Sequence, residues 1–252
     1  MRALVVTAVV AEADSVVTGL TPHPDAPGPE PRTLSLGYPR TKSGEGYLIT
    51  RRDLPGIAFD VLVGGVGPAA AAAGTATALA LAGYELVVSA GIGGGFDPAA
   101  PVGSLVVADA IVAADLGAET PEGFLDVSAL GFGHSVHLPP AELAARAAEA
   151  TGALLAPVLT VSTVTGTAAR AADLAARHPM AGAEAMEGFG VAEAAAAHGL
   201  PVLEVRAVSN AVGPRDRAAW RIGDALAALT AGFRVLGPVL ANWGERHEHD
   251  HR

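Results

Sequence analysis

Short apolar runs alternate with longer alanine-rich runs along the chain, and this alternation constrains the fold more than any other feature. Residues 3–10, 58–63 and 105–113 are rich in valine and show no polar alternation, which is typical of strands buried on both faces. The alanine-rich runs between such segments, for example 68–83 and 186–197, have the composition of helices. Strands that alternate with helices predict an α/β fold with helices flanking a sheet.

The same pattern predicts the remaining elements and a single domain. We expect further strands at 86–90, 154–164 and 202–209, and helices at 139–152, 168–178 and 218–243. Residues 21–45 are rich in proline, glycine and charge and predict a surface excursion. Because no repeat or linker interrupts the pattern, we expect one domain over 1–243 and a disordered, histidine-rich tail over 244–252.

Composition excludes several classes of function. The chain has 26 acidic and 16 basic residues, a formal charge of −10, which argues against a nucleic-acid or anionic-membrane partner. It has no cysteine, so disulfides, thiolate metal sites and cysteine nucleophiles are excluded. The uncharged stretch 61–84 is too rich in glycine for a membrane span, and the apolar N-terminal run is too short for a signal peptide. We therefore expect a cytoplasmic protein.

Two glycine-rich segments follow predicted strands. Residues 65–70 read GVGPAA and match the form of a dinucleotide fingerprint, but the next strand ends without an acidic residue, and Pro68 removes a backbone donor. The single lysine, Lys42, is not part of a P-loop motif. The sequence therefore predicts no cofactor and no metal. Residues 91–95 read GIGGG after a buried strand, and we expect a ligand-binding loop there.

Three polar residues interrupt apolar runs near the ends of predicted elements. Glu12 follows the first strand, Glu187 begins an alanine-rich helix, and Asn210 ends the strand 202–209. Taken singly, each has an ordinary structural interpretation, since a carboxylate is favoured at a helix start and asparagine is common in turns.

In this order, however, the three residues and the segments around them resemble the nucleoside phosphorylase/nucleosidase superfamily. The resemblance spans nearly the whole chain and rests on Glu12, Glu187 with Met186, and the segments 63–67, 89–95, 102–107 and 205–210. It implies a single-domain, three-layer fold with a mixed, partly barrel-like sheet flanked by helices, and a homo-oligomer. Segments 115–124, 163–167 and 210–216 are similar to the subfamily that hydrolyses futalosine for menaquinone synthesis.

The resemblance also implies roles for individual residues. Glu12 would activate a water molecule, Glu187 would accept hydrogen bonds from the ribose hydroxyls, and Met186 would pack against the sugar. The remaining substrate contacts would come from Ile92, Gly93, Gly94, Thr165, Gly166 and Thr167. Futalosine carries a carboxylated aromatic ketone, and the candidates to meet it are Arg215, Arg217, His134 and His137.

Asn210 indicates which of the possible substrates the site prefers. Relatives that cleave adenine nucleosides carry aspartate at this place, which can protonate the purine, whereas an amide can only donate a hydrogen bond to N7 or O6. Asn210 therefore favours a 6-oxopurine such as hypoxanthine. Acidic residues in the expected loop 11–14, together with Ile92, favour water over phosphate as the nucleophile. The alternatives are a methylthioadenosine/S-adenosylhomocysteine nucleosidase, another purine nucleosidase or phosphorylase, and a nucleoside-binding sensor.

Overall fold

The computed structural model describes residues 1–21, 33–36 and 47–249. Most of the excursion expected over 21–45, including Lys42, lies outside these residues. Of the tail expected over 244–252, residues 250–252 also lie outside the described residues, whereas residues 244–249 belong to the last helix.

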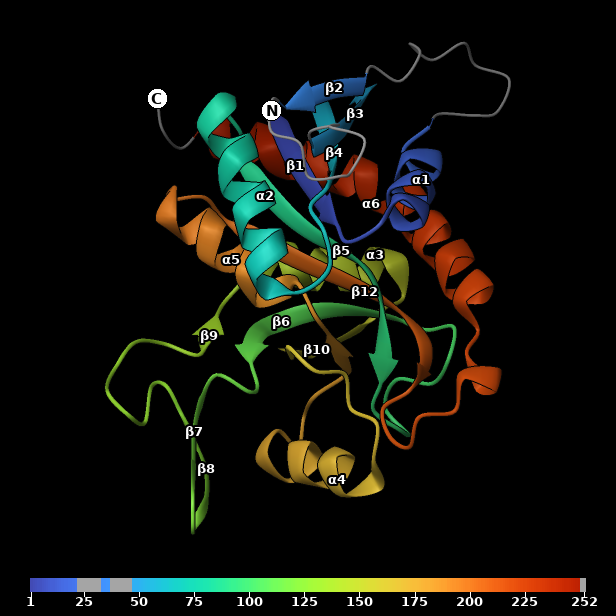
Figure 1. Ribbon diagram of the computed structural model, residues 1–252. Helices are drawn as coiled ribbons and strands as arrows, with labels where there is room; N and C mark the ends of the chain where they lie inside the picture. The colour runs from blue at the N-terminus through green and yellow to red at the C-terminus, as the bar shows by residue number, and fades with distance from the viewer. Residues whose placement is uncertain (22–32, 37–46, 250–252) are drawn as a thin grey trace.

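The main sheet is a closed barrel that continues into an open sheet (Figure 1). Parallel pairing joins β5 to β12 and β6 to β10, and antiparallel pairing joins β12 to β6. Strand β11 pairs with both β10 and β5 and so closes the barrel, while β1, β4, β3 and β2 extend the sheet outward from β5. The strands of this sheet are β1 (Arg2–Thr7), β2 (Thr33–Leu36), β3 (Tyr47–Leu54), β4 (Ile57–Val63), β5 (Leu86–Gly95), β6 (Leu105–Ala113), β9 (Val136–His137), β10 (Leu154–Thr160), β11 (Ala183–Ala185) and β12 (Val202–Ala211).

Helices cover both faces of this sheet (Figure 1). On one face, α1 (Val10–Gly19), α3 (Ala141–Thr151) and α6 (Ile222–His249) share a core with β1, β5 and β12. On the other, α2 (Pro68–Leu81) and α5 (Gly188–Ala197) share a second core with the same strands. Helix α4 (Ala168–Arg177) and the hairpin of β7 (Gly117–Thr120) and β8 (Gly123–Asp126) lie outside these layers. The predicted three-layer α/β fold with a partly barrel-like sheet is confirmed.

Local sequence signals explain several helix ends. Pro68 occupies the first turn of α2, where its missing N–H leaves no helical hydrogen bond unmade. Gly152 ends α3 in the left-handed conformation, with φ +67°, which glycine adopts without strain. Thr167 caps α4, because its hydroxyl accepts a hydrogen bond from the amide of Arg170 at 3.1 Å.

Several boundaries differ from those expected. The first strand ends at Thr7, and residues 11–14 form the first turns of α1 rather than a loop. Residues 91–95 continue β5 rather than forming a binding loop. Helix α5 begins at Gly188 rather than at Met186, and the last helix covers Ile222–His249. The strands β2, β3, β7, β8, β9 and β11 were not anticipated.

The glycines of β5 allow the barrel to close. A Cβ on Gly93 would lie 2.7 Å from the carbonyl oxygen of Glu184 in β11. Only a residue without a side chain lets the two strands approach this closely. The glycine run was therefore misread as a loop because its function is a long-range strand contact.

Helix α6 has one membrane-like property that its packing explains. Its segment Ile222–Trp243 is apolar and long enough to cross a membrane. Its inner face, however, is buried in the core through Leu229, Phe233, Leu236 and Leu240. We therefore regard α6 as a core helix of the domain.

Candidate active site

A cavity of about 370 Å³ opens where the carboxyl ends of β5 and β12 meet the starts of α1 and α5. Ligands commonly bind at such strand ends in α/β sheets. The residues that line the cavity are Ala8, Val9, Glu12, Val66, Ile92, Gly93, Gly94, Val164, Glu184, Ala185, Met186, Glu187, Ser209, Asn210, Arg215 and Trp220.

Glu12 is a buried carboxylate held by three backbone amides. Its Oε2 accepts hydrogen bonds from the amides of Ala8 at 2.9 Å and Val9 at 3.2 Å, and its Oε1 accepts one from Ile92 at 2.9 Å. Burial raises the pKa of Glu12, opposed by the Ile92 hydrogen bond and the charge of Arg206. A carboxylate offers about four acceptor positions, so one position remains for a donor in the cavity.

Gly91 creates the space that Glu12 occupies. A Cβ at this position would lie 2.6 Å from Glu12 Oε1 and 2.8 Å from Arg206 Nη1. Both distances are shorter than real Cβ contacts, so the carboxylate could not keep its place beside a larger residue. The glycine therefore fixes the position of the Glu12 side chain.

Glu187 is the second buried carboxylate of the cavity and precedes the first residue of α5. Its Oε1 accepts a hydrogen bond from the amide of Gly67 at 3.1 Å, and its Oε2 pairs with Arg206 Nη1 at 3.2 Å. The Gly67 amide belongs to the segment that resembled a dinucleotide fingerprint. In this structure the amide is directed at a protein carboxylate rather than at a cofactor.

Arg206 lies beneath the cavity and is fully buried. Its Nε donates to Glu204 Oε1 at 2.9 Å and its Nη2 donates to the Ser89 hydroxyl at 2.9 Å. Burial lowers the pKa of Arg206, but the charges of the neighbouring carboxylates outweigh it and raise the pKa. Since this guanidinium is occupied by protein partners, its role is to position Glu187.

Asn210 faces the cavity from a bulge in β12. The pairing of β12 with β5 shifts register between Val208 and Asn210. The Ser209 hydroxyl donates to Asn210 Oδ1 at 2.9 Å, and Asn210 Nδ2 donates to the carbonyl oxygen of Ala211 at 2.9 Å. Because the oxygen is already an acceptor and only one N–H is used, the amide presents its second N–H as a free donor.

Glu184 is a third buried carboxylate of the cavity that the sequence analysis did not single out. Its Oε1 accepts from the amide of Thr165 at 2.9 Å, and its Oε2 accepts from the hydroxyl of the same residue. Burial raises the pKa of Glu184, opposed by both Thr165 hydrogen bonds. A usable signal was present, since Glu184 lies among small and apolar residues just before Met186 and Glu187.

The structure brings most of the predicted site residues together and separates a few. Glu12, Ile92, Met186, Glu187 and Asn210 all line the cavity, as do Gly93, Gly94 and Arg215. Thr165 is buried against Glu184 behind the cavity wall, while Val164 contributes to that wall.

The other candidates lie away from the cavity lining. Gly166 accepts a hydrogen bond from the amide of Arg215 at 3.1 Å, and Thr167 caps α4. Arg217 stacks on the Trp220 ring from 6.0 Å, while His134 and His137 contact Glu193 of α5. Trp220 and Ser209 line the cavity without having been predicted.

Comparison with known proteins identifies the family. The model of the phosphorylase superfamily matches residues 38–231. A protein of Streptomyces coelicolor named futalosine hydrolase is 61% identical over 96% of this chain and 98% of its own length.

At lower identity, two solved structures share the fold. A futalosine hydrolase of Helicobacter pylori has a TM-score of 0.78 and 14% identity, over 94% of this chain and 97% of that one. A methylthioadenosine/S-adenosylhomocysteine nucleosidase of Colwellia psychrerythraea has a TM-score of 0.76 and 21% sequence identity. The match covers 96% of this chain and 95% of that one. The chain belongs to the phosphorylase superfamily.

Proposed function

We propose that this protein hydrolyses the N-ribosidic bond of futalosine, releasing hypoxanthine and dehypoxanthine futalosine in menaquinone synthesis. The observation that carries the proposal is the presence of Glu12, Glu187 and Asn210 in the lining of one cavity. The name and 61% identity of the Streptomyces coelicolor relative support the choice of substrate.

Glu12 is the general base of the proposed reaction. Glu12 lines the cavity, so a water molecule there can donate a hydrogen bond to its remaining acceptor position. As the bond between the anomeric carbon and the base nitrogen breaks, the water oxygen bonds to that carbon and its proton passes to Glu12. The departing base takes up a proton from solvent, and Glu12 afterwards releases its proton to solvent, so the net reaction consumes one water.

Glu187 holds the sugar in this proposal. The Gly67 amide and Arg206 fix its two oxygens, so the carboxylate is already oriented before substrate binds. Ribose hydroxyls can donate to its remaining acceptor positions, and the neighbouring Met186 lines the same cavity and packs against the sugar face. A sugar held in one orientation exposes its anomeric carbon to the water on Glu12.

Asn210 selects the base. Its free N–H can donate to N7 or to the O6 oxygen of hypoxanthine, and the Ser209 hydroxyl keeps the amide in this orientation. The 6-amino group of adenine is itself a donor and would leave the Asn210 N–H without an acceptor at that position. The site therefore favours a 6-oxopurine nucleoside over methylthioadenosine.

Arg215 is the candidate for the carboxylated aromatic end of futalosine. It is exposed, lines the cavity and lies 5.3 Å from the centre of the Trp220 ring, which also lines the cavity. An aromatic ring can stack on Trp220 while its carboxylate pairs with the guanidinium.

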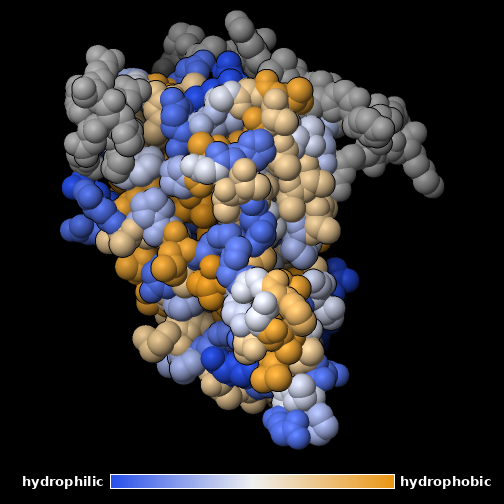
Figure 2. Space-filling model, turned by 90° about the vertical axis from the view of Figure 1, so that its left-hand side faces the viewer, coloured by the Kyte–Doolittle hydropathy of each residue, from blue (hydrophilic) through white to orange (hydrophobic). Residues whose placement is uncertain are grey.

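The protein is proposed to act in the cytoplasm as a homo-oligomer. Figure 2 views the molecule from the side of β7, β8 and β9, where orange apolar surface is spread among blue polar areas. Phe132 and Leu138, on either side of β9, are 82% and 74% exposed and offer apolar side chains to a second copy of the chain. Light scattering on the purified protein tests this, and a monomeric mass at all concentrations would contradict it.

The proposed substrate is tested by incubating the enzyme separately with futalosine, inosine and methylthioadenosine and quantifying the free base. We expect hypoxanthine from futalosine at the highest kcat/KM. Preferential release of adenine from methylthioadenosine would support the alternative nucleosidase. Tight binding of futalosine without any base release would support a nucleoside-binding sensor, and Glu12→Gln would then change nothing.

A further inference from the structure

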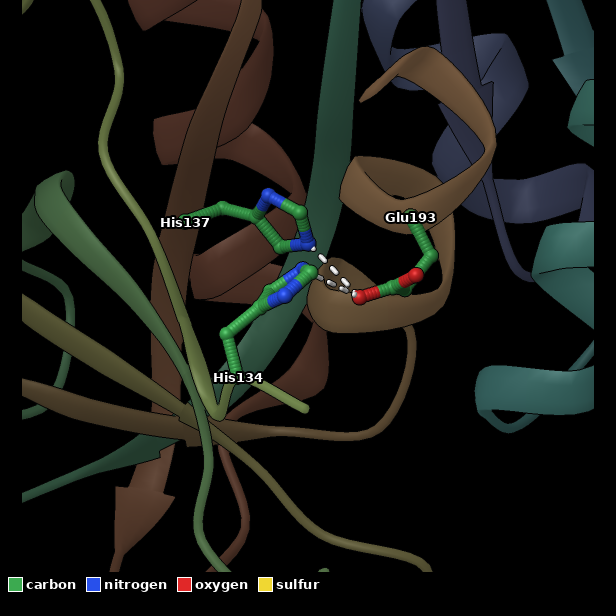
Figure 3. Close-up of side chains that lie close together, drawn as sticks. All are labelled: His134, His137 and Glu193. Carbon is green, nitrogen blue, oxygen red and sulfur yellow. Dashed lines mark hydrogen bonds and ion pairs between the residues drawn. The ribbon is translucent and has the colours of Figure 1, made fainter. Parts of the chain in front are cut away.

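Two histidines and a glutamate converge outside the cavity. His134 lies just before β9 and His137 is its last residue, and both direct Nε2 at the same carboxylate oxygen of Glu193 on α5 (Figure 3). The Nε2 atoms lie 3.1 Å and 2.9 Å from Glu193 Oε1. One potential ligand atom from each of the three residues lies within 4.8 Å of the others.

The backbone around the cluster is held in place by other contacts. His137 pairs with Ile111 of β6, and its ring lies 5.1 Å from that of Phe189 on α5. The preceding segment is fixed by Ser128, whose hydroxyl accepts a hydrogen bond from the Ser135 amide at 2.9 Å. The cluster is therefore preorganised by β6, by α5 and by the segment itself.

This donor set suits a divalent transition-metal ion. Two imidazole nitrogens and one carboxylate oxygen are ligands that Zn²⁺ takes in three-residue sites, where water fills the fourth position. Ligand atoms around a tetrahedral ion with bonds of about 2.0–2.1 Å lie roughly 3.3 Å apart. The two distances to Glu193 are within a few tenths of an ångström of this value, and the side chains of His134 and Glu193 are 61% and 45% exposed, so both can adjust.

We propose that His134, His137 and Glu193 bind one divalent transition-metal ion of the Zn²⁺ class. The ion ties β9 and the residues just before it to α5, the helix that follows the cavity residue Glu187. None of the three ligands lines the cavity, so the ion is structural and takes no part in the chemistry of the nucleoside. The proposal stands independently of the proposed function.

The test is isothermal titration of the chelator-treated full-length chain with ZnCl2, with MgCl2 as the hard-cation comparison. The C-terminal segment contains His247, His249 and His251, so each titration is repeated in a chain with these three replaced by alanine. We expect one Zn²⁺ per chain in both backgrounds, no binding of Mg²⁺, and a higher Tm with Zn²⁺. Binding that disappears in the tail-substituted chain would overturn the proposal.

Variants assign the ligands. His134→Ala, His137→Ala and Glu193→Gln should each weaken Zn²⁺ binding by more than about 100-fold, since even outer-shell partners of metal sites contribute 10–100-fold. His198→Ala is the matched control, because His198 is exposed beyond the last residue of the same helix and should leave binding unchanged. Co²⁺ should give the visible absorption of a four-coordinate site only when all three ligands are present. Unchanged affinity in His134→Ala, whose exposed side chain is not needed for folding, would contradict the assignment.

Discussion

The amide of Ile92 donates a hydrogen bond to Glu12 Oε1 at 2.9 Å and joins the end of β5 to the first turn of α1. Two amides of the segment entering α1 hold the other oxygen of the same carboxylate. The position of Glu12 therefore depends on how strand and helix meet rather than on the helix alone. This arrangement leads to predictions about the carboxylate and about the glycine beside it.

Glu12→Gln should lower kcat by about 10²–10⁴-fold, the range that general acid–base catalysis contributes. Because the base acts when deprotonated and burial raises the pKa of Glu12, kcat/KM of the wild type should fall with decreasing pH at values above the ordinary glutamate pKa. The variant should lose this acidic limb and retain binding. A pH–rate profile with equilibrium binding measures both, and an unchanged limb in the variant would rule out Glu12 as the titrating base.

Gly91→Ala should lower kcat more than it raises KM. The new methyl group would clash with Glu12 Oε1 and Arg206 Nη1. The Glu12 carboxylate would therefore move away from the position in which it activates water next to the sugar. Gly83→Ala is the control, because nothing lies within 4 Å of a Cβ there. Steady-state kinetics with futalosine compares the two, and equal activity in both variants would show that the close approach at Gly91 has no functional role.

Asn210→Ala should reduce kcat/KM for futalosine by about 10–100-fold, because it leaves the acceptor on the base unsatisfied in the closed site, at a cost of about 1–3 kcal/mol. Asn210→Asp should lower futalosine turnover and raise the release of adenine from methylthioadenosine. Asn242→Ala, an exposed asparagine outside the cavity lining, serves as control. If Asn210→Ala cleaved the hypoxanthine nucleoside as well as the wild type does, the assignment of base recognition to this residue would fail.

The sequence was sufficient for much of the fold because the central strands β1, β5, β6 and β10 are mostly apolar. The same reasoning missed α1, since the apolar run 3–10 was interpreted as one strand followed by a loop, whereas β1 ends at Thr7 and Val10 already begins α1. It also misread Gly93, because the need for glycine there comes from Glu184, far away in the sequence, whose carbonyl oxygen leaves no room for a Cβ.

Within the site, the difference between Thr165 and Val164 shows a further limit. The motif 163–167 could be recognised from the sequence, but which of its side chains faces the cavity depends on the backbone. The structure directs Thr165 inward to Glu184, and Val164 forms the wall. Neither that contact nor the buried position of Glu184 could be read from local pattern.

Glu184 should make stability depend on pH. Burial raises the pKa of Glu184, so the folded state binds its proton more tightly than the unfolded chain does. The resulting stabilisation is complete below the unfolded pKa of about 4.3 and is lost as pH rises through the folded value. Glu184→Gln lacks this titration. The unfolding free energy of the wild type relative to the variant should therefore decrease as the pH rises from the unfolded pKa of Glu184 through its folded pKa. Urea denaturation at several pH values measures it, and a pH-independent difference would contradict the prediction.

The central claim, hydrolysis of futalosine by water, is tested most directly by the masses of both products formed with and without inorganic phosphate. The account predicts hypoxanthine and a free-sugar product, dehypoxanthine futalosine, at the same rate under both conditions. A sugar 1-phosphate, or base release that requires phosphate, would contradict it.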